Sequence, residues 1–188
     1  QFKHRLLEFL VTEMNFTAFA IEASFSACQP INEYVLYGKG DRESALTGQW
    51  YTVWDTEEVA ALIDWMRAYN QTVPDEKKVR FYGVDITRNA VGRQAVLDYL
   101  HKVALEKLPA TESLFEALGI VDAKWPLRID EEAGKTMEGL LPQLQSLMDN
   151  LLANKDALIS KSSLAAFEQV VRYLHIMKQW LITYSPLL

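Results

Sequence analysis

The chain has 188 residues, of which 49% are hydrophobic and 23% are charged, a composition typical of a folded globular protein with a sizeable core. Its formal net charge is -6 and its basic residues are not clustered, so a broad nucleic-acid-binding surface is not expected. A single cysteine excludes an intramolecular disulfide, and no apolar run reaches the roughly 18 residues that a membrane-spanning helix needs.

The first predicted element is an amphipathic helix that ends at Met14. Its apolar side chains recur every three or four residues, the spacing that places them on one helical face. Asn15 follows at a position where helices often end in a left-handed residue, a conformation that asparagine tolerates. The residues predicted to share the face are Lys3, Leu7, Leu10 and Met14, widened by Leu6 and Phe9.

The second predicted element is a strand over residues 16–23, an apolar run with one carboxylate, Glu22, near its end. Moving an ionised carboxylate out of water is costly, so a buried Glu22 would need a partner or a chemical role. The alternative is that Glu22 simply reaches solvent at the strand end. The sequence leaves both alternatives open.

A helix is predicted over residues 26–37, followed by a turn at residues 38–41. The helical segment contains Cys28, whose thiol we expect to be buried and inert. The two glycines of the turn lack the spacing and the Lys-Ser/Thr ending of a phosphate-binding loop. We therefore interpret them as structural.

Residues 55–58 resemble a helix cap, and the helix that they open is predicted to run to Tyr69. Pro74 marks a loop. Residues 79–86 then have the β-branched and aromatic content of a strand, with Asp85 near its end. The inner side of the predicted helix carries Val59, Leu62, Ile63 and Met66.

From Gln94 onward the pattern is helical, and two apolar stripes predict a helical hairpin. We predict an α/β fold that is mostly helical, with helices around a small parallel sheet and a C-terminal helical hairpin. Residues 1–93 would form the α/β part, and residues 94–188 a helical subdomain of the same domain. The two stripes are Leu140, Leu144, Leu147 and Leu151, and Phe167, Val170, Leu174, Met177 and Leu181.

The predicted strand ends carry the first candidate site residues. In a parallel sheet, ligands collect beyond the carboxyl ends of the strands, and Glu22 and Asp85 lie near those ends. Lys3 joins them if the first helix follows an upstream strand of the same sheet. Alternatively, the aliphatic stem of Lys3 covers apolar surface while its ammonium group reaches water.

Familiar catalytic signatures are absent from this sequence: the Gly-x-Ser-x-Gly elbow, the His-Glu-x-x-His helix, paired Cys-x-x-Cys and the dinucleotide glycine fingerprint. His4, His101 and His175 are far apart and lack metal-ligand spacing. We expect neither a metal nor a cofactor in this chain.

Six motifs follow one another in the first half of the chain: residues 2–7 (FKHRLL), 15–23 (NFTAFAIEA), 31–38 (INEYVLYG), 54–58 (WDTEE), 65–70 (WMRAYN) and 81–86 (FYGVDI). In this order they resemble the erythromycin esterase-like hydrolases. The helical remainder is similar to that family only in its general character.

The resemblance implies a site in which a histidine activates water to open an ester or lactone, and in which Glu22 matches a strand-end glutamate. A basic residue on the preceding helix belongs to the same site; it is arginine in characterised macrolide esterases and Lys3 here, so a two-pronged hold on a carboxylate is not implied. Asn15 replaces a usual glycine.

The resemblance also implies that the family's histidine segment precedes Gln1 and that its later histidines follow Leu188. We therefore expect the chain to be a fragment of a larger α/β domain, with a signal peptide, if any, upstream of Gln1. A sheet with only two recognisable strands is marginal by itself, which supports the same expectation.

Our leading hypothesis is a bacterial, cytoplasmic hydrolase of the antibiotic-resistance type that opens an ester or macrolactone by attack of water. Glu22 would orient the histidine or share its proton, and Lys3 would stabilise negative charge. Asp85, Arg88 and Asn32 would contact the substrate. The expected partner is a small-molecule ester or lactone, with no nucleic acid and no membrane. Two alternatives stay open: a binding module without catalysis, and a metal-dependent hydrolase.

Overall fold

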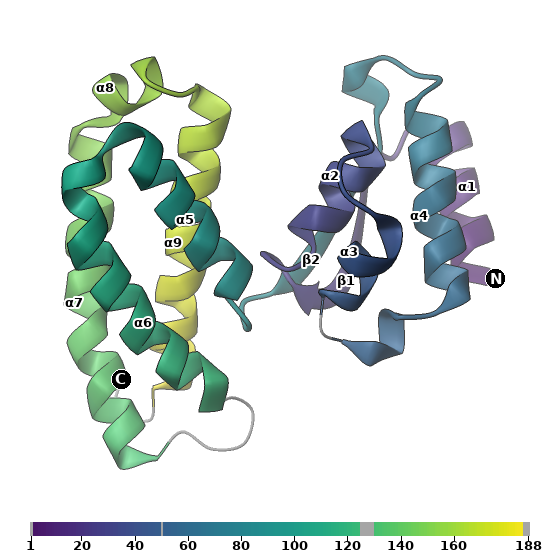
Figure 1. Cartoon of the computed structure of the whole chain (residues 1–188). Coiled ribbons are helices and arrows are strands. Elements are labelled where there is room, and N and C mark those ends of the chain that lie inside the picture. The colour runs from purple at the N-terminus through teal and green to yellow at the C-terminus, as the bar shows by residue number, and fades with distance from the viewer. Residues whose placement is uncertain (1, 50, 125–129, 186–188) are drawn as a thin grey trace. The chain divides into compact units, whose positions relative to one another are not determined.

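Two parallel strands and the helices beside them form the first of two units into which the computed structural model divides, Gln1–Asp85 and Ile86–Leu188 (Figure 1). The structure describes residues 2–49, 51–124 and 130–185. Residues 125–129 and 186–188 of the predicted helical part lie outside the described residues.

The elements of the first unit are α1 (Phe2–Met14), β1 (Ala18–Ser24), α2 (Gln29–Tyr37), α3 (Arg42–Thr47), the 3-10 helix η1 (Thr52–Trp54), α4 (Glu57–Asn70), η2 (Asp75–Lys77) and β2 (Arg80–Asp85). Those of the second are α5 (Ala90–Val103), η3 (Leu105–Lys107), α6 (Leu108–Lys124), α7 (Glu131–Ala153), α8 (Lys155–Ser160) and α9 (Leu164–Tyr184). The predicted fold class, mostly helical with a small parallel sheet and C-terminal helices, is confirmed.

β1 and β2 pair in parallel, beginning with Ala18 opposite Arg80. The register shifts between Ile21 and Ser24, where β1 carries one more residue than the facing stretch of β2. Gly83 of β2 lies against this irregularity, because a Cβ atom placed there would come within 2.4 Å of two main-chain oxygens of β1. The close approach of the two strands at this point therefore requires glycine.

One face of the sheet is buried against helices, and the other carries exposed side chains. Ile21 is 5% exposed, whereas its neighbours Ala20 and Glu22 are exposed. β2 alternates in the same way, since Phe81 is buried and Val84 is 65% exposed. Of the two alternatives for Glu22, the structure shows the exposed one. The core of this unit includes Leu7, Val11, Ile21, Ile31, Val35, Leu62, Ile63, Met66 and Phe81.

Two buried amide side chains hold the main chain at β2. Asn70 accepts a hydrogen bond from the Val79 N–H at 2.8 Å and donates to the carbonyl oxygens of Val79 and Val35, at 2.8 and 3.2 Å. The Asn32 side-chain oxygen accepts from the Phe81 N–H at 2.9 Å. These bonds tie β2 to α2 and α4 and satisfy buried main-chain groups.

The buried strip of α1 is narrower than the sequence pattern predicts. Leu7 and Val11 are 4% and 1% exposed, but Met14 is 54% exposed, and Leu6 and Phe9 are also exposed. Among the described elements, α1 packs mainly against α4, which leaves much of its surface uncovered. The predicted left-handed ending is confirmed, because Asn15 has a φ of 57°.

α2 begins at Gln29, three residues later than predicted. Residues 25–28 form a turn instead, and Pro30 occupies the first turn of the helix, where its missing N–H is not needed. Cys28 ends this turn and is 1% exposed, and desolvation raises the pKa of its thiol to about 12. The prediction of a buried, unreactive thiol agrees with this environment.

α4 begins at Glu57 with Thr56 as its N-cap. The Thr56 hydroxyl accepts a hydrogen bond from the Val59 N–H at 3.3 Å, as expected for a threonine cap. Asp55, the first residue of the predicted cap, instead accepts from the Thr47 hydroxyl at 3.4 Å. The cap therefore lies one residue later than the sequence pattern suggested.

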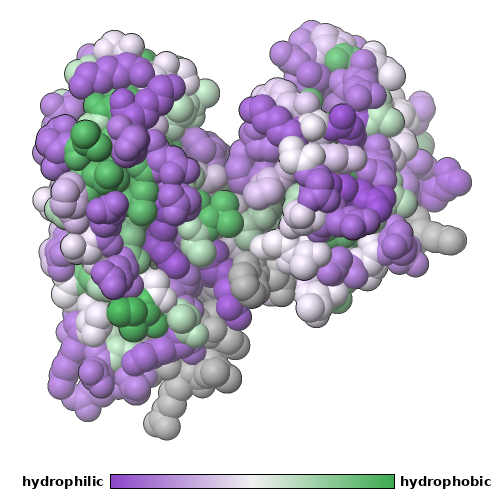
Figure 2. Space-filling model, viewed as in Figure 1, coloured by the Kyte–Doolittle hydropathy of each residue, from purple (hydrophilic) through white to green (hydrophobic). Residues whose placement is uncertain are grey.

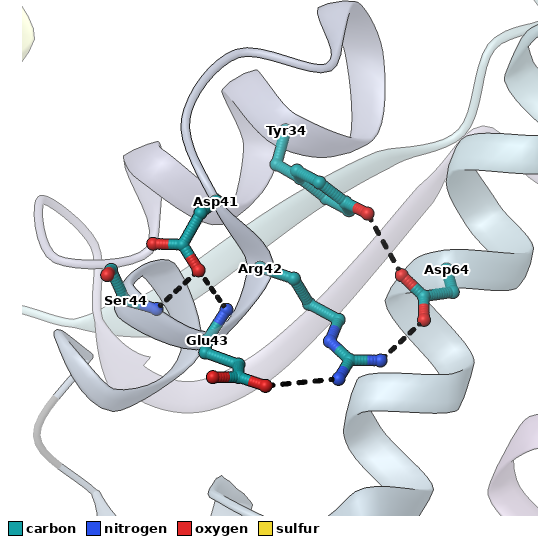
Figure 3. Close-up of polar contacts among 6 residues, drawn as sticks. All are labelled: Tyr34, Asp41, Arg42, Glu43, Ser44 and Asp64. Carbon is teal, nitrogen blue, oxygen red and sulfur yellow. Dashed lines mark hydrogen bonds and ion pairs between the residues drawn. The ribbon is translucent and has the colours of Figure 1, made fainter.

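A polar cluster joins α2, α3 and α4 (Figure 3). Asp64 of α4 accepts hydrogen bonds from the Tyr34 hydroxyl at 3.0 Å and from the Arg42 guanidinium at 2.8 Å. Asp41 caps α3 by accepting from two main-chain N–H groups of its first turn. Desolvation, together with the hydrogen bond to Asp64, raises the pKa of Tyr34 above its ordinary value.

The second unit is a bundle in which α5, α6, α7 and α9 pack against one another. The stripe predicted on α9 is buried throughout, and on α7 Leu140, Leu144 and Leu151 are buried while Leu147 is partly exposed. Arg93 of α5 and Asp122 of α6 form an ion pair at 2.8 Å, with side chains 15% and 7% exposed. This buried pair links two helices of the bundle.

Within the described residues, every helix is either too short or too polar to cross a membrane. Hydrophilic side chains cover much of the visible surface of each unit, and the clearest hydrophobic patches lie on the helical unit (Figure 2). A cytoplasmic location stays a prediction.

Candidate functional site

β1 and β2 end at the same edge of the sheet, at Ser24 and Asp85. The Phe25 N–H donates a hydrogen bond to the Asp85 carbonyl oxygen at 2.9 Å, which ties the two ends together. Glu22 lies two residues before the end of β1, and its side chain is exposed. Glu22 and Asp85 thus occupy the sheet edge at which parallel strands collect ligands. Their chemical roles stay predictions.

Trp54, at the end of η1, connects two of the predicted site residues. Its indole N–H donates a hydrogen bond to the Glu22 carbonyl oxygen at 2.9 Å. The Lys3 ammonium nitrogen lies over the same indole, 4.6 Å from the ring centroid. A cation over the face of tryptophan is attracted by the ring quadrupole. The side chain of Lys3 is therefore held beside the end of β1.

Tyr51, at the other end of η1, reaches the end of β2. Its hydroxyl donates a hydrogen bond to the Asp85 carboxylate at 2.5 Å. Its main chain is held by Gln49, whose side chain is fully buried, donates to the Tyr51 carbonyl oxygen at 2.7 Å and accepts from the Tyr51 N–H at 2.9 Å. The short segment from Tyr51 to Trp54 therefore contacts the ends of both strands.

A pocket of about 380 Å³ lies beside Lys3 and Trp54. Its wall is mainly apolar, and its polar groups include Lys3, His4 and Glu58. An apolar hollow with a few polar groups at its margin is the usual form of a small-molecule site. The apolar part of the wall consists of Phe2, Phe19, Ile21, Val53, Trp54, Val59 and Leu62.

The remaining predicted site residues lie in different surroundings. Asn32 is only 7% exposed, and its side-chain oxygen is bonded to the Phe81 N–H. Arg88 belongs to the second unit and has a φ of 57°, a strained value for a side chain of this size. Substrate binding by Asn32 and Arg88 stays a prediction.

The three histidines are divided between the two units. His4 lies 3.5 Å from the Glu8 carboxylate and packs edge-on against Trp65, while His101 and His175 are exposed in the second unit. In the described part of the chain, no three His, Cys, Asp or Glu side chains are close enough together to hold a metal ion.

A second pocket, of about 570 Å³, lies between α6 and α7 in the helical unit. Its wall includes Leu114, Pro142 and Leu147, together with Glu106 and Lys107. Lys3 lines the first pocket, and Glu22 and Asp85 lie at the strand ends, whereas none of the five predicted site residues lines this second pocket; we therefore place the candidate site in the first unit.

Sequence reasoning missed Gln49, Tyr51 and Trp54. Tyr51 and Trp54 act across the fold, because Tyr51 and Asp85 are 34 residues apart and Trp54 and Glu22 are 32 residues apart. Gln49 acts locally, through its hydrogen bonds to the main chain of Tyr51. The signal that could have indicated Tyr51 and Trp54 is the run of aromatic residues shortly before the helix cap at Thr56, in a segment that connects two strands of one sheet.

Comparison with known proteins adds to this geometry. The model of the family described as erythromycin esterase matches residues 11–185. Glu22 lies within that range, and Lys3 precedes it. Erythromycin esterase type II of Escherichia coli is 26% identical over 181 residues, which are 91% of this chain and 42% of that protein. The chain thus spans about two fifths of that relative's length.

Three solved structures are similar to this chain over nearly all of its length, and this chain covers less than half of each of them. A Bacillus cereus protein of known crystal structure is similar with a TM-score of 0.73 and 26% identity, over 96% of this chain and 43% of the other. A succinoglycan biosynthesis protein has a TM-score of 0.75 at 23% identity, over 98% and 43%. A mutant erythromycin esterase in its open conformation has a TM-score of 0.67 at 14% identity, over 94% and 44%. The last two show similarity of fold alone.

Proposed function

Because this chain belongs to the erythromycin esterase family, we propose that the protein that contains it is a hydrolase that opens an ester or lactone by attack of water. The observation that carries the proposal is the position of Glu22. It lies exposed at the carboxyl end of β1, where Trp54 also holds the Lys3 ammonium group. An acid–base group can take part in the proton transfers of ester hydrolysis, and a positive charge can stabilise the oxyanion that forms.

In this proposal Glu22 takes part in proton transfer, and Lys3 stabilises negative charge. The water-activating histidine that the family resemblance implies would come from the part of the protein outside this chain. Glu22 would orient that histidine or share its proton. Lys3 would stabilise the negative charge that develops on the carbonyl oxygen, as a point charge rather than as a two-pronged guanidinium.

The substrate-binding proposals concern Asp85, Arg88 and Asn32. Asp85 lies at the end of β2, where the Tyr51 hydroxyl fixes its carboxylate. Asn32 would support the site through β2, because its side-chain oxygen already holds the Phe81 N–H. Arg88 is proposed from the sequence as a basic group for a polar part of the substrate.

We further propose a macrolactone antibiotic as the substrate, and hence a role in resistance. Support comes from the 26% identical relative named erythromycin esterase type II. A simpler ester is the competing substrate, because membership of the family does not distinguish a macrolactone from an open-chain ester. Parallel assays with erythromycin and with p-nitrophenyl butyrate separate the two.

The test of the site compares two identical substitutions in the complete protein. Glu22→Gln removes the carboxylate at the end of β1, and we expect kcat/KM to fall by on the order of 100-fold. Glu76→Gln is the matched control, because Glu76 is exposed in η2, just before β2 begins. Equal activity of Glu22→Gln and Glu76→Gln would refute the assignment of Glu22.

The apolar pocket beside Lys3 favours a second candidate, a small-molecule binding module without catalysis. Titration calorimetry of the complete protein with erythromycin distinguishes it from the hydrolase. Saturable binding with no release of a new carboxylate would favour the module. Turnover of either ester would exclude it.

A further inference from the structure

Trp54 makes two contacts that no sequence motif indicated, one to Lys3 and one to the main chain of Glu22. The first contact holds the ammonium group of Lys3, and the second holds the strand that carries Glu22. Trp54 thus contacts the side chain of Lys3 and the main chain of Glu22, and it is partly buried.

The backbone around Trp54 is held at several points. The Trp54 N–H donates to the Tyr51 carbonyl oxygen at 2.9 Å, and the same oxygen accepts from the Gln49 side chain at 2.7 Å. On the other side, Thr56 begins α4 as its N-cap. Gln49 is fully buried, so this support does not depend on a mobile surface side chain. The indole is therefore presented from a fixed main chain.

Lys3, by contrast, is exposed and lies in the first turn of α1. A lysine side chain has four rotatable bonds and loses much of its conformational freedom when it is held in place. Among the described residues, no carboxylate lies within ion-pair distance of Lys3, so its contact with the Trp54 ring is the interaction that orients it.

The partner of the Lys3 ammonium group is an aromatic ring and not a carboxylate, and this affects how much of the charge is available. A carboxylate partner would neutralise the Lys3 charge and compete with a developing oxyanion for it. An indole ring attracts the ammonium group without carrying a net charge. The charge stays available, and the ring only restricts where the charge lies. A charge that is already in place when negative charge develops stabilises the transition state without the cost of reorganisation.

We propose that Trp54 is a positioning residue of the hydrolase. Its ring holds the Lys3 ammonium group, and its indole N–H holds the end of β1 that carries Glu22. This inference rests on the proposed function of Lys3. It predicts that replacement of Trp54 lowers kcat more than it raises KM, because Trp54 acts on the position of the charge rather than on substrate binding.

The experiment uses the complete protein with p-nitrophenyl butyrate as the probe. Trp54→Leu removes the ring and the indole N–H together, and we expect kcat to fall by on the order of tenfold. Trp54→Phe keeps an aromatic ring, and its kcat should fall by roughly fivefold or less. Trp65→Phe is the matched control, because Trp65 lies in the same unit and stacks on Tyr69. We expect it to leave kcat unchanged.

A double-mutant cycle tests whether Trp54 acts through Lys3. If it does, Trp54→Leu lowers kcat in the wild-type background and has little further effect in Lys3→Met. An equal loss in both backgrounds overturns the inference for Lys3, because Trp54 would then act independently of the ammonium group.

A structural readout is independent of turnover. In wild-type protein, the NMR signals of the Lys3 ε-CH₂ group should be shifted upfield by the ring current of the Trp54 indole, and Trp54→Leu should abolish that shift. An unchanged Lys3 signal in Trp54→Leu overturns the contact itself. Circular dichroism of each variant verifies that it is folded, and Trp54→Phe serves where Trp54→Leu does not fold.

Failure of the positioning role of Trp54 can be distinguished from failure of the proposed function of Lys3. Wild-type turnover in Trp54→Leu together with an inactive Lys3→Met overturns the positioning role alone. Wild-type turnover in Lys3→Met overturns the proposed function of Lys3, and the role of Trp54 in catalysis with it.

Discussion

Gly83→Ala tests how closely the two strands approach at the irregularity in β1. A Cβ atom at position 83 would lie 2.4 Å from the carbonyl oxygens of Ala23 and Ser24. These are main-chain atoms of a paired strand, so they cannot rotate away as a flexible side chain could. Relief requires the strands to separate by roughly 0.6 Å, to the closest approach of about 3 Å that real Cβ atoms show.

The magnitude follows from two opposing effects. Overpacking against atoms that cannot move costs up to about 3 kcal/mol. Replacing glycine by alanine within a strand recovers roughly 0.5–1 kcal/mol, because the unfolded chain loses less conformational freedom on folding. The expected net loss in the free energy of unfolding is therefore about 2 kcal/mol.

Urea unfolding of the purified protein, followed by circular dichroism, measures this loss from the shift of the midpoint. Gly139→Ala is the matched control, because Gly139 is exposed in α7 with nothing within 4 Å of its Cβ position. It should raise stability by up to about 1 kcal/mol through helix propensity. A Gly83→Ala protein within about 0.5 kcal/mol of wild type would refute the reasoning.

Two further predictions concern buried groups. Arg93→Met leaves the Asp122 carboxylate buried without its ion-pair partner, and we expect it to lower the free energy of unfolding by about 3 kcal/mol. The double variant Arg93→Met with Asp122→Leu should recover part of that loss. Urea unfolding measures both. A double variant no more stable than Arg93→Met contradicts this. Cys28, whose thiol pKa is raised to about 12 by desolvation, should resist a thiol reagent at pH 8 in the native protein and react once the protein is unfolded in urea. Because its folded-state pKa is raised, its contribution to stability is present below the ordinary thiol pKa and is lost as the pH rises toward 12; rapid native labelling at pH 8 would contradict the burial.

Much of the fold followed from local patterns. The α9 stripe is buried as its spacing predicts, and Asn15 adopts the left-handed conformation that ends α1. The two strands lie where short apolar and β-branched runs predicted them. Each of these features depends on side chains within a few positions of one another, so the sequence contains the information directly.

The candidate site was predictable only in part. That Glu22 and Asp85 share one edge follows from two parallel strands in one sheet, and the structure shows that arrangement. Which face of β1 is exposed did not follow from the apolar run, because that run lacks the polar alternation that marks a half-buried strand. The exposure of Glu22 was decided by the helices that cover the opposite face.

The sequence by itself determined most of the helices, both strands, the family and the strand-end carboxylates. Only the tertiary structure decided that Trp54 contacts both Lys3 and Glu22, and that Tyr51 reaches Asp85. It also decided that Met14 is exposed, because within the described residues α1 packs mainly against α4 and Met14 lies outside that contact. The physical reason is the same for each: these contacts join residues from different elements of the fold, and local propensity carries no information about which elements meet in space.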